Sequence, residues 1–136
     1  MTNFLYVTST LGTGGQERQL YYLLSAMDRN KYTATVIVWN YSETDKYVEL
    51  IKALNVAIIG YSPAESTVKK YLNFRKYVEQ KKPIVIHSFT FYLNLSVWFA
   101  SALKNTVSFG GLRNTYELYL KDVGFLTGFL CGLLPY

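Results

Sequence analysis

Three short groups of residues in this 136-residue chain have the chemistry to bind a ligand. They are the glycine cluster Gly12-Thr13-Gly14-Gly15, the pair His87-Ser88 and the pair Arg113-Asn114. A glycine turn ahead of a helix exposes backbone N–H groups, which favour an anion such as a phosphate or carboxylate. An arginine fork binds the same two groups, and a histidine can contact a substrate. Together these residue types indicate anion binding.

The glycine cluster fits neither of two familiar phosphate loops. The dinucleotide fingerprint G-x-G-x-x-G is matched by Gly12 and Gly14, but Glu17 takes the third glycine position. A P-loop needs Lys and then Ser or Thr after its last glycine, whereas Gln16 and Glu17 follow Gly15. The cluster is therefore either a ligand loop or a tight turn between strand and helix, and spacing alone leaves both open.

The remaining chemistry is sparse. His87 is the only histidine and Cys131 the only cysteine, which are too few for a Ser/His/Asp set, a metal centre or an internal disulfide. His87 could equally contact substrate or be held by a structural hydrogen bond. Arg113 could form a fork to phosphate or a surface ion pair with Glu117. Cys131 has apolar neighbours, which favour a buried, inert thiol in a reducing cytosol.

Composition describes one globular domain, with 50% apolar and 17% charged residues and a net charge of +5. Basic residues cluster at Lys69-Lys70, Arg75-Lys76 and Lys81-Lys82, mostly within one predicted helix. We expect a solvated helix face there, with contact to anionic lipid head groups or phosphates as the alternative. Nucleic acid is disfavoured as a partner because no recognition motif accompanies the charge. The sequence shows neither a signal peptide nor a membrane span.

Hydrophobic periodicity predicts five strands and the helices between them. One helix carries the stripe Leu20, Leu23, Leu24 and Met27, and the next carries Tyr47, Leu50, Ile51 and Leu54. A third helix is predicted to start at Ser62-Pro63 and run to about residue 80, with Tyr71, Phe74 and Val78 on one face, and a fourth covers about 91–104. The predicted strands are 3–7, 32–39, 55–59, 83–87 and 106–109.

This alternation predicts an α/β fold, a Rossmann-like doubly wound parallel sheet with strand order 3-2-1-4-5. Ligands of such sheets bind beyond the carboxyl ends of the strands, at the switch point between the first and fourth strands. Residues 12–15, 87–90 and 110–114 should therefore meet at one edge of the sheet.

The end of the chain is unusual. Residues 116–134 are almost continuously apolar, with glycines four apart, and predict a helix covered either by further chain or by a membrane surface. The chain also stops where a sixth strand is expected. We therefore interpret 1–136 as a single domain from a longer protein.

With these motifs in order, the chain resembles the N-terminal domain of a family-4 glycosyltransferase. Gly14-Gly15-Gln16-Glu17-Arg18-Gln19-Leu20 is similar to the family's G-G-x-E-R/x-x-L opening. Pro83-Ile84-Val85-Ile86-His87-Ser88-Phe89 is similar to its P-D-V-V-H-x-H segment, with Phe89 in place of the second histidine. The resemblance covers essentially all 136 residues, although each motif is short.

The resemblance implies the N-terminal, acceptor-side half of a two-domain GT-B enzyme, with a C-terminal half that binds a nucleotide-sugar and carries an E-x7-E pair. It implies retention at the anomeric carbon, no required metal and no cofactor other than the donor substrate. Gly14, Gly15 and Arg113 would approach the donor diphosphate, and His87, Ser88 and Asn114 the acceptor. The family's histidine after the fifth strand is replaced by Gly110-Gly111, so no catalytic residue can be carried over.

The main hypothesis is a retaining hexosyltransferase domain of surface polysaccharide or glycolipid assembly, cytoplasmic and at the inner face of the membrane. Its partners would be the missing C-terminal domain, a nucleotide-sugar donor and a glycan or lipid-linked acceptor, with peripheral membrane contact. The fragment alone should be inactive, and its exposed apolar surface favours self-association. The alternative is a non-catalytic Rossmann-like binding or assembly module. A sugar-nucleotide epimerase is weaker, because that chemistry needs more acids and histidines.

Overall fold

Strands and helices alternate through the computed structural model, which describes residues 1–102 and 106–111. In chain order the elements are β1 (Thr2–Thr8), α1 (Gly15–Ala26), β2 (Tyr32–Val38), α2 (Lys46–Lys52), β3 (Ala57–Gly60), α3 (Thr67–Lys81), β4 (Val85–Ser88), the short 3-10 helix η1 (Phe91–Leu93), α4 (Asn94–Ser101) and β5 (Val107–Gly110).

The five strands form one parallel sheet in the order β3-β2-β1-β4-β5. This confirms the predicted fold class and the strand order 3-2-1-4-5. Register aligns the last residues of the central strands: Val7 of β1 lies beside Ser88 of β4, and Ser88 lies beside Gly110 of β5. Because all strands run the same way, the segments that leave β1, β2, β4 and β5 start from one edge of the sheet.

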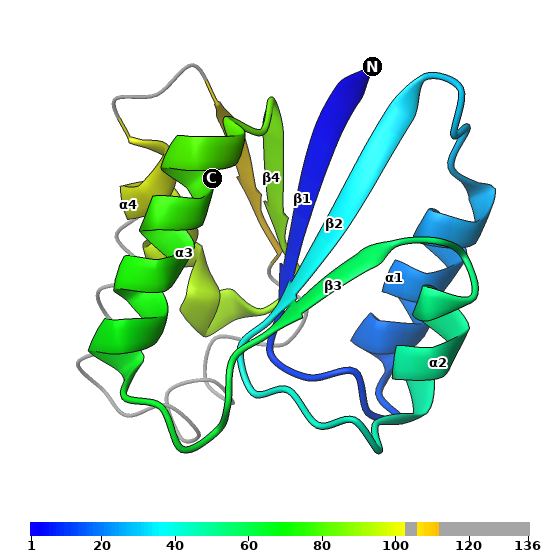
Figure 1. Cartoon of the computed structure of the whole chain (residues 1–136), viewed down its shortest axis with the longest axis horizontal. Coiled ribbons are helices and arrows are strands. Elements are labelled where there is room, and N and C mark those ends of the chain that lie inside the picture. The colour runs from blue at the N-terminus through cyan, green and yellow to red at the C-terminus, as the bar shows by residue number, and fades with distance from the viewer. Residues whose placement is uncertain (103–105, 112–136) are drawn as a thin grey trace.

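Helices cover both faces of the sheet, with α1 and α2 on one side and α3 and α4 on the other (Figure 1). Strand β1 lies in the middle and is buried on both faces. Leu5 and Val7 belong to the core against α3 and α4, whereas Tyr6 belongs to the core against α1 and α2. This explains why β1 is a continuous apolar run instead of an alternating one.

The buried faces of α1 and α2 differ from the predicted apolar stripes. Leu20 and Leu24 are fully buried but Leu23 is exposed, and Ile51 is buried while its neighbour Leu50 is exposed. Each exposed leucine lies about 100° around the helix from the buried residue that follows it. Helix α1 therefore buries one row of side chains, whereas α2 buries Tyr47, Val48 and Ile51, so its buried face is turned toward Val48.

Helix α3 begins at Thr67, four residues later than the predicted start at Pro63. Residues 62–65 form a turn closed by a hydrogen bond from the Glu65 N–H to the Ser62 carbonyl, 3.0 Å. Ser66 is the N-cap, and its hydroxyl accepts from the Lys69 N–H at 3.3 Å. The helix start is thus set by a serine cap.

The basic residues of α3 do not share one face. Lys69, Arg75 and Lys76 are exposed, as predicted for a solvated face, but Lys70 is only 3% exposed. Lys70 lies on the buried row that continues through Phe74 and Val78, so the prediction of a solvated side chain is wrong for this residue.

Within the described ranges, no helix combines the length and the hydropathy needed to cross a bilayer. The apolar segment 116–134, with Cys131, lies outside the described residues, as do Arg113 and Asn114.

Candidate functional site at the carboxyl ends of the strands

Hydrogen bonds join the segments that leave the central strands. The Ser9 N–H, just after β1, donates to the Thr90 hydroxyl at 3.0 Å, and the Gly111 N–H donates to the Ser88 carbonyl at 2.8 Å. The Thr90 hydroxyl also donates to Oε1 of Gln16, in the first turn of α1, at 3.5 Å. The segments after β1, β4 and β5 therefore form one continuous rim at this edge.

The glycine loop leads directly into α1: Gly14 is the N-cap and Gly15 the first helical residue. Glu17, in the first turn, folds back over the loop, and its Oε1 accepts from the Thr10 hydroxyl at 2.9 Å. A Cβ added to Gly14 would lie 2.3 Å from Glu17 Oε2, so the buried carboxylate packs against this glycine. Its negative charge is favourable at the positive end of α1.

The space beside Gly15 is open, since a Cβ added there would meet nothing within 4 Å. The first N–H groups of any α-helix lack a carbonyl partner within the helix, so an anion could reach the backbone from this side. The Glu17 carboxylate beside Gly14 opposes that approach. The loop thus offers a donor surface whose charge is already largely balanced from within.

His87 and Ser88, the predicted acceptor residues, lie on opposite faces of β4. His87 is half-buried among aromatic rings, with centroid distances of 4.5 Å to Phe89, 6.0 Å to Tyr6 and 6.4 Å to Phe109. Ser88 is fully buried, and its hydroxyl donates to the Thr90 carbonyl at 2.9 Å. In this structure the histidine belongs to an aromatic cluster and the serine stabilises the turn after β4.

The end of β5 rests on the start of α4. A Cβ added to Gly110 would lie 2.6 Å from Nδ2 of Asn94, and that amide donates to the Gly111 carbonyl at 3.5 Å. This contact fixes where the chain leaves β5. The predicted site residues Arg113 and Asn114 follow immediately but are not among the residues described, so their roles stay predictions.

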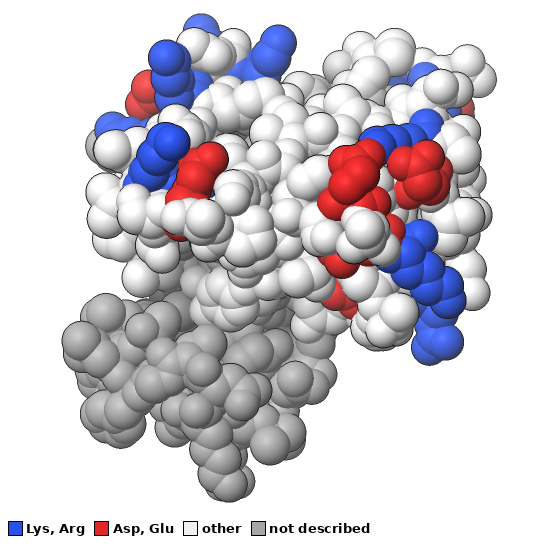
Figure 2. All heavy atoms as spheres, turned by 60° about the horizontal axis from the view of Figure 1, so that its bottom comes forward, with Lys and Arg blue, Asp and Glu red and all other residues white. Residues whose placement is uncertain are grey.

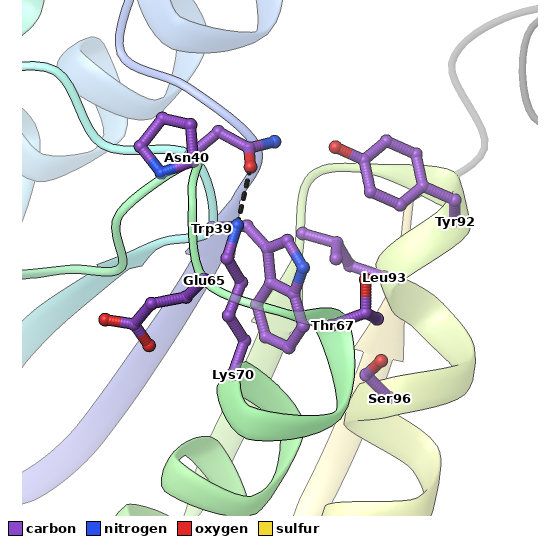
Figure 3. Close-up of a pocket in the computed structure, with 9 residues that line it drawn as sticks. Trp39, Asn40, Glu65, Thr67, Lys70, Tyr92, Leu93 and Ser96 are labelled. Atoms are coloured by element: carbon purple, nitrogen blue, oxygen red, sulfur yellow. Dashed lines mark hydrogen bonds between the residues drawn. The ribbon is translucent and has the colours of Figure 1, made fainter.

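A cavity of about 430 Å³ opens at the same edge, on the α3 and α4 side of the sheet (Figure 3). We call it the Lys70 pocket. Apolar surface comes from Trp39, at the end of β2, and from Leu93. Its polar lining includes Asn40, Glu65, Thr67, Lys70, Tyr92 and Ser96.

A chain of polar contacts connects the Lys70 pocket to the rim. The Lys70 ammonium donates to Asn40 Oδ1 at 2.8 Å, and Asn40 Nδ2 donates to the Ser9 hydroxyl at 3.4 Å. The Ser9 hydroxyl also shares a hydrogen bond with the Tyr92 hydroxyl. Because the Ser9 N–H donates to Thr90, one network runs from the pocket lysine to the start of α1.

The positive charge of Lys70 has no carboxylate beside it: among the described residues, no ion pair within 4.0 Å involves this lysine. Glu65 also lines the pocket, but its carboxylate pairs with Lys69 at 3.9 Å and points away from the Lys70 ammonium (Figure 3). A buried charge without a counter-charge is unfavourable.

The surface charge differs between the two sides of the sheet. Figure 2 turns the carboxyl-end edge toward the viewer, with acidic side chains gathered on the α1 and α2 side and basic ones prominent on the α3 side. The exposed Glu49 is on α2, and the exposed Lys69 and Lys76 are on α3. Within the part of the chain that the structure describes, no three His, Cys, Asp or Glu side chains are grouped to hold a metal.

Comparison with known proteins gives a structural likeness without a sequence match. Neither a protein-family model nor a curated protein sequence matches the chain. Among solved structures, the lipopolysaccharide outer core galactosyltransferase WaaB in its apo form aligns with a TM-score of 0.60 and 12% identity. The alignment covers 80% of this chain and 32% of that protein, so the chain spans about a third of its length. At this identity the likeness shows a shared α/β fold.

Sequence reasoning missed the residues of the Lys70 pocket. The sequence pattern predicts a solvated face for Lys70 and indicates no functional role for Asn40 or Tyr92. A signal was present: Lys70, Phe74 and Val78 recur every four residues, so the lysine occupies a position of the buried helical row. A cation at such a position is either compensated by the fold or held for a ligand.

Proposed function

We propose that this chain is the acceptor-side domain of a two-domain GT-B glycosyltransferase. The enzyme would move a sugar from a nucleotide-sugar to a glycan or lipid-linked acceptor in surface polysaccharide or glycolipid assembly. The observation that carries the proposal is the 3-2-1-4-5 parallel sheet, whose β1 and β4 loops meet at the switch point, aligned over 80% of the chain with a galactosyltransferase. Open parallel sheets bind ligands at this place.

In this proposal the glycine loop faces the donor. A diphosphate would approach the open side of Gly15, with Arg113 as a second contact, and these donors would stabilise the charge that develops on the leaving group. Glu17 limits the approach at Gly14. Transfer would proceed with retention at the anomeric carbon and without a required metal.

The acceptor would lie along the remainder of the rim. His87 and Asn114 keep their proposed acceptor roles, and the buried Ser88 would serve the acceptor only by holding the turn after β4. The Lys70 pocket adds a second polar surface on the same edge. A C-terminal domain would supply the nucleotide-sugar site and an E-x7-E pair, so 1–136 alone would not turn over. The exposed Lys69, Arg75 and Lys76 of α3 would meet anionic lipid at the cytoplasmic face of the membrane.

The test uses the full-length protein and a panel of nucleotide-sugars, with release of the nucleoside diphosphate as the readout. Gly15→Val should reduce turnover, because its side chain would fill the open space that the diphosphate needs. Thr13→Val, an exposed neighbour in the same loop, is the matched control and should keep activity. Unchanged turnover in Gly15→Val would remove the loop from the mechanism, and absence of turnover with every donor would reject the function.

A non-catalytic binding or assembly module is the second candidate, and exposed aromatic side chains favour it. Trp98 and Phe99 on α4 and Phe109 on β5 are all exposed, which suits a docking surface. The gene sequence beyond Tyr136 separates the two candidates. A second α/β half with an E-x7-E pair favours the enzyme, whereas a stop codon soon after favours the module.

A further inference from the structure

We propose that the Lys70 pocket binds a phosphate monoester carried by a sugar or polyol. The inference that this phosphate monoester is part of the glycosyl acceptor rests on the proposed glycosyltransferase function. The binding of the phosphate itself rests only on the geometry of the pocket.

The Lys70 ammonium is a buried charge without a counter-charge among the described residues. Lys70 is 3% exposed, and Asn40 Oδ1 at 2.8 Å is the acceptor found for its ammonium among the described residues. An ammonium has three N–H donors, so one neutral acceptor leaves most of its capacity unused. Removing such a charge from water is unfavourable unless a partner of opposite charge completes the site. The missing partner is therefore an anion, and the cavity beside Lys70 is where it fits.

Hydrogen-bond donors besides Lys70 line the cavity. Thr67 and Ser96 line it with hydroxyl groups, and Thr67 is the first residue of the 15-residue helix α3. The positive end of that helix adds to the charge of Lys70. Phosphate presents several oxygens in different directions and suits donors from a lysine, two hydroxyls and a helix start. A carboxylate, with two oxygens in one plane, would leave part of this set unused.

The volume of the Lys70 pocket fits a ligand larger than phosphate. About 430 Å³ exceeds what a phosphate group alone requires, and it lies in the range of small-ligand pockets. The surface of Trp39 and Leu93 offers an apolar side for a ring, while Asn40 and Tyr92 offer hydrogen-bonding groups for hydroxyls. The pocket therefore suits a phosphate attached to a compact polar ring.

Calorimetric titration of the chain with glucose 6-phosphate, and with glucose as the uncharged control, measures this binding. Lys70→Met keeps the side-chain volume, removes the charge and should weaken binding at least about tenfold, the usual effect of losing a charge-assisted hydrogen bond. Lys81→Met removes the same charge from an exposed position of the same helix and should leave affinity unchanged. Absence of saturable binding to the wild-type chain, or equal losses in both variants, would overturn the proposal.

A second variant guards against misfolding of the first. Ser96→Leu keeps Lys70 but fills the cavity from the half-buried side of α4. It should abolish binding of glucose 6-phosphate while the circular dichroism melt stays cooperative. Full affinity in Ser96→Leu would place the phosphate elsewhere and contradict the proposal.

The phosphate could come from a soluble sugar phosphate or from a lipid head group, and vesicles separate the two. Phosphatidylcholine vesicles with phosphatidic acid present a phosphate monoester on a membrane. Lys70-dependent binding to these vesicles supports the lipid source, whereas Lys70-dependent binding of glucose 6-phosphate alone supports the soluble source. Binding in both assays without dependence on Lys70 overturns the site.

Donor hydrolysis by the full-length protein keeps the two proposals separable. Release of nucleoside diphosphate by the wild-type protein tests the enzyme function, and loss of transfer to a phosphorylated acceptor in Lys70→Met tests the pocket. Donor turnover without phosphate binding would reject the pocket and leave the enzyme function standing. Phosphate binding without donor turnover would support the pocket and reject the enzyme function.

Discussion

The glycine loop and the Lys70 pocket lie on the same edge of the sheet but differ in how their charge is balanced. At the loop, the Glu17 carboxylate lies against Gly14, accepts from Thr10 and faces the positive end of α1. In the pocket, Lys70 is just as inaccessible, yet a single neutral amide oxygen is its acceptor among the described residues. Charge at the loop is balanced by residues of the chain itself, whereas the charge of Lys70 is not balanced by any described residue.

The glycine loop is recognisable from its sequence motif, whereas Lys70 stands out only because its buried charge has no counter-charge. The loop attracts attention because glycines before a helix are typical of phosphate sites, but its own carboxylate already occupies part of the favourable field. The lysine belongs to no motif, yet its burial without a counter-charge demands an explanation. Experiments that remove one charge or one wall at a time can break or sharpen this contrast.

The largest effect should come from the apolar wall of the pocket. Trp39 is buried, with edge contacts to Tyr61 and Phe74 at centroid distances of 5.6 and 6.1 Å. Trp39→Ala should lower the free energy of unfolding by about 3–5 kcal/mol in urea denaturation, because it leaves a large void. On the loop side, Thr10→Val loses one hydrogen bond and should lower it by about 1 kcal/mol. Equal losses would show that the pocket wall is no better packed than the loop.

Lys70→Met should move stability in the opposite direction. Removing a buried charge that has no counter-charge relieves a desolvation cost of several kcal/mol. It also leaves Asn40 Oδ1 without its donor, which costs about 1–3 kcal/mol, so the free energy of unfolding should stay the same or rise. The same urea experiment measures the change, with Lys81→Met as the exposed control on the same helix. A marked loss of stability in Lys70→Met would mean that the lysine is a structural contact, and the contrast with the loop would disappear.

Tyr61 reports on the packing behind the pocket through its titration. Burial raises the pKa of Tyr61 to about 12, from an ordinary value of 10.0. The folded chain therefore keeps this proton while the unfolded chain loses it, so stability should be unaffected below about pH 10 and fall between about pH 10 and 12. Tyr61→Phe should flatten part of this fall in urea denaturation across that range. An identical slope in the variant would show that Tyr61 is not the group responsible.

The smallest effect should appear at the loop. Glu17→Gln removes the internal carboxylate and should lower the free energy of unfolding by about 0.3–1 kcal/mol, since a favourable charge leaves the start of α1. It should also strengthen inorganic phosphate binding at the Gly14 and Gly15 amides, measured by NMR titration. Glu49→Gln on the exposed face of α2 is the control. Phosphate affinity that is unchanged by Glu17→Gln would show that the carboxylate does not guard the loop.

The sequence was sufficient to predict the sheet and the part of its rim that the structure describes. Buried strands that alternate with helical segments permit few arrangements, and β1 was recognisable because burial on both faces makes it continuously apolar. The start of α3 was misplaced because Ser62-Pro63 resembles a helix start, whereas the chain makes one more turn before Ser66 caps the helix. Local signals of equal strength compete there, and tertiary packing decides.

The pocket could not be predicted in the same way. Asn40 and Tyr92 are far apart in sequence, and only the sheet order brings them to the same cavity as Lys70. The burial of Lys70 was hidden by its basic neighbours, which made the segment resemble a solvated face. Helical periodicity could have identified it, because the lysine shares the row of Phe74 and Val78.

The most direct measurement is a ¹⁵N NMR titration of the chain with glucose 6-phosphate, because it locates the anion on one region or the other. We expect saturable shifts at the backbone amides of Asn40, Thr67 and Ser96, which are lost in Lys70→Met and retained in Lys81→Met. Shifts confined to Gly14 and Gly15, or shifts around the pocket that persist without the Lys70 ammonium, would contradict it.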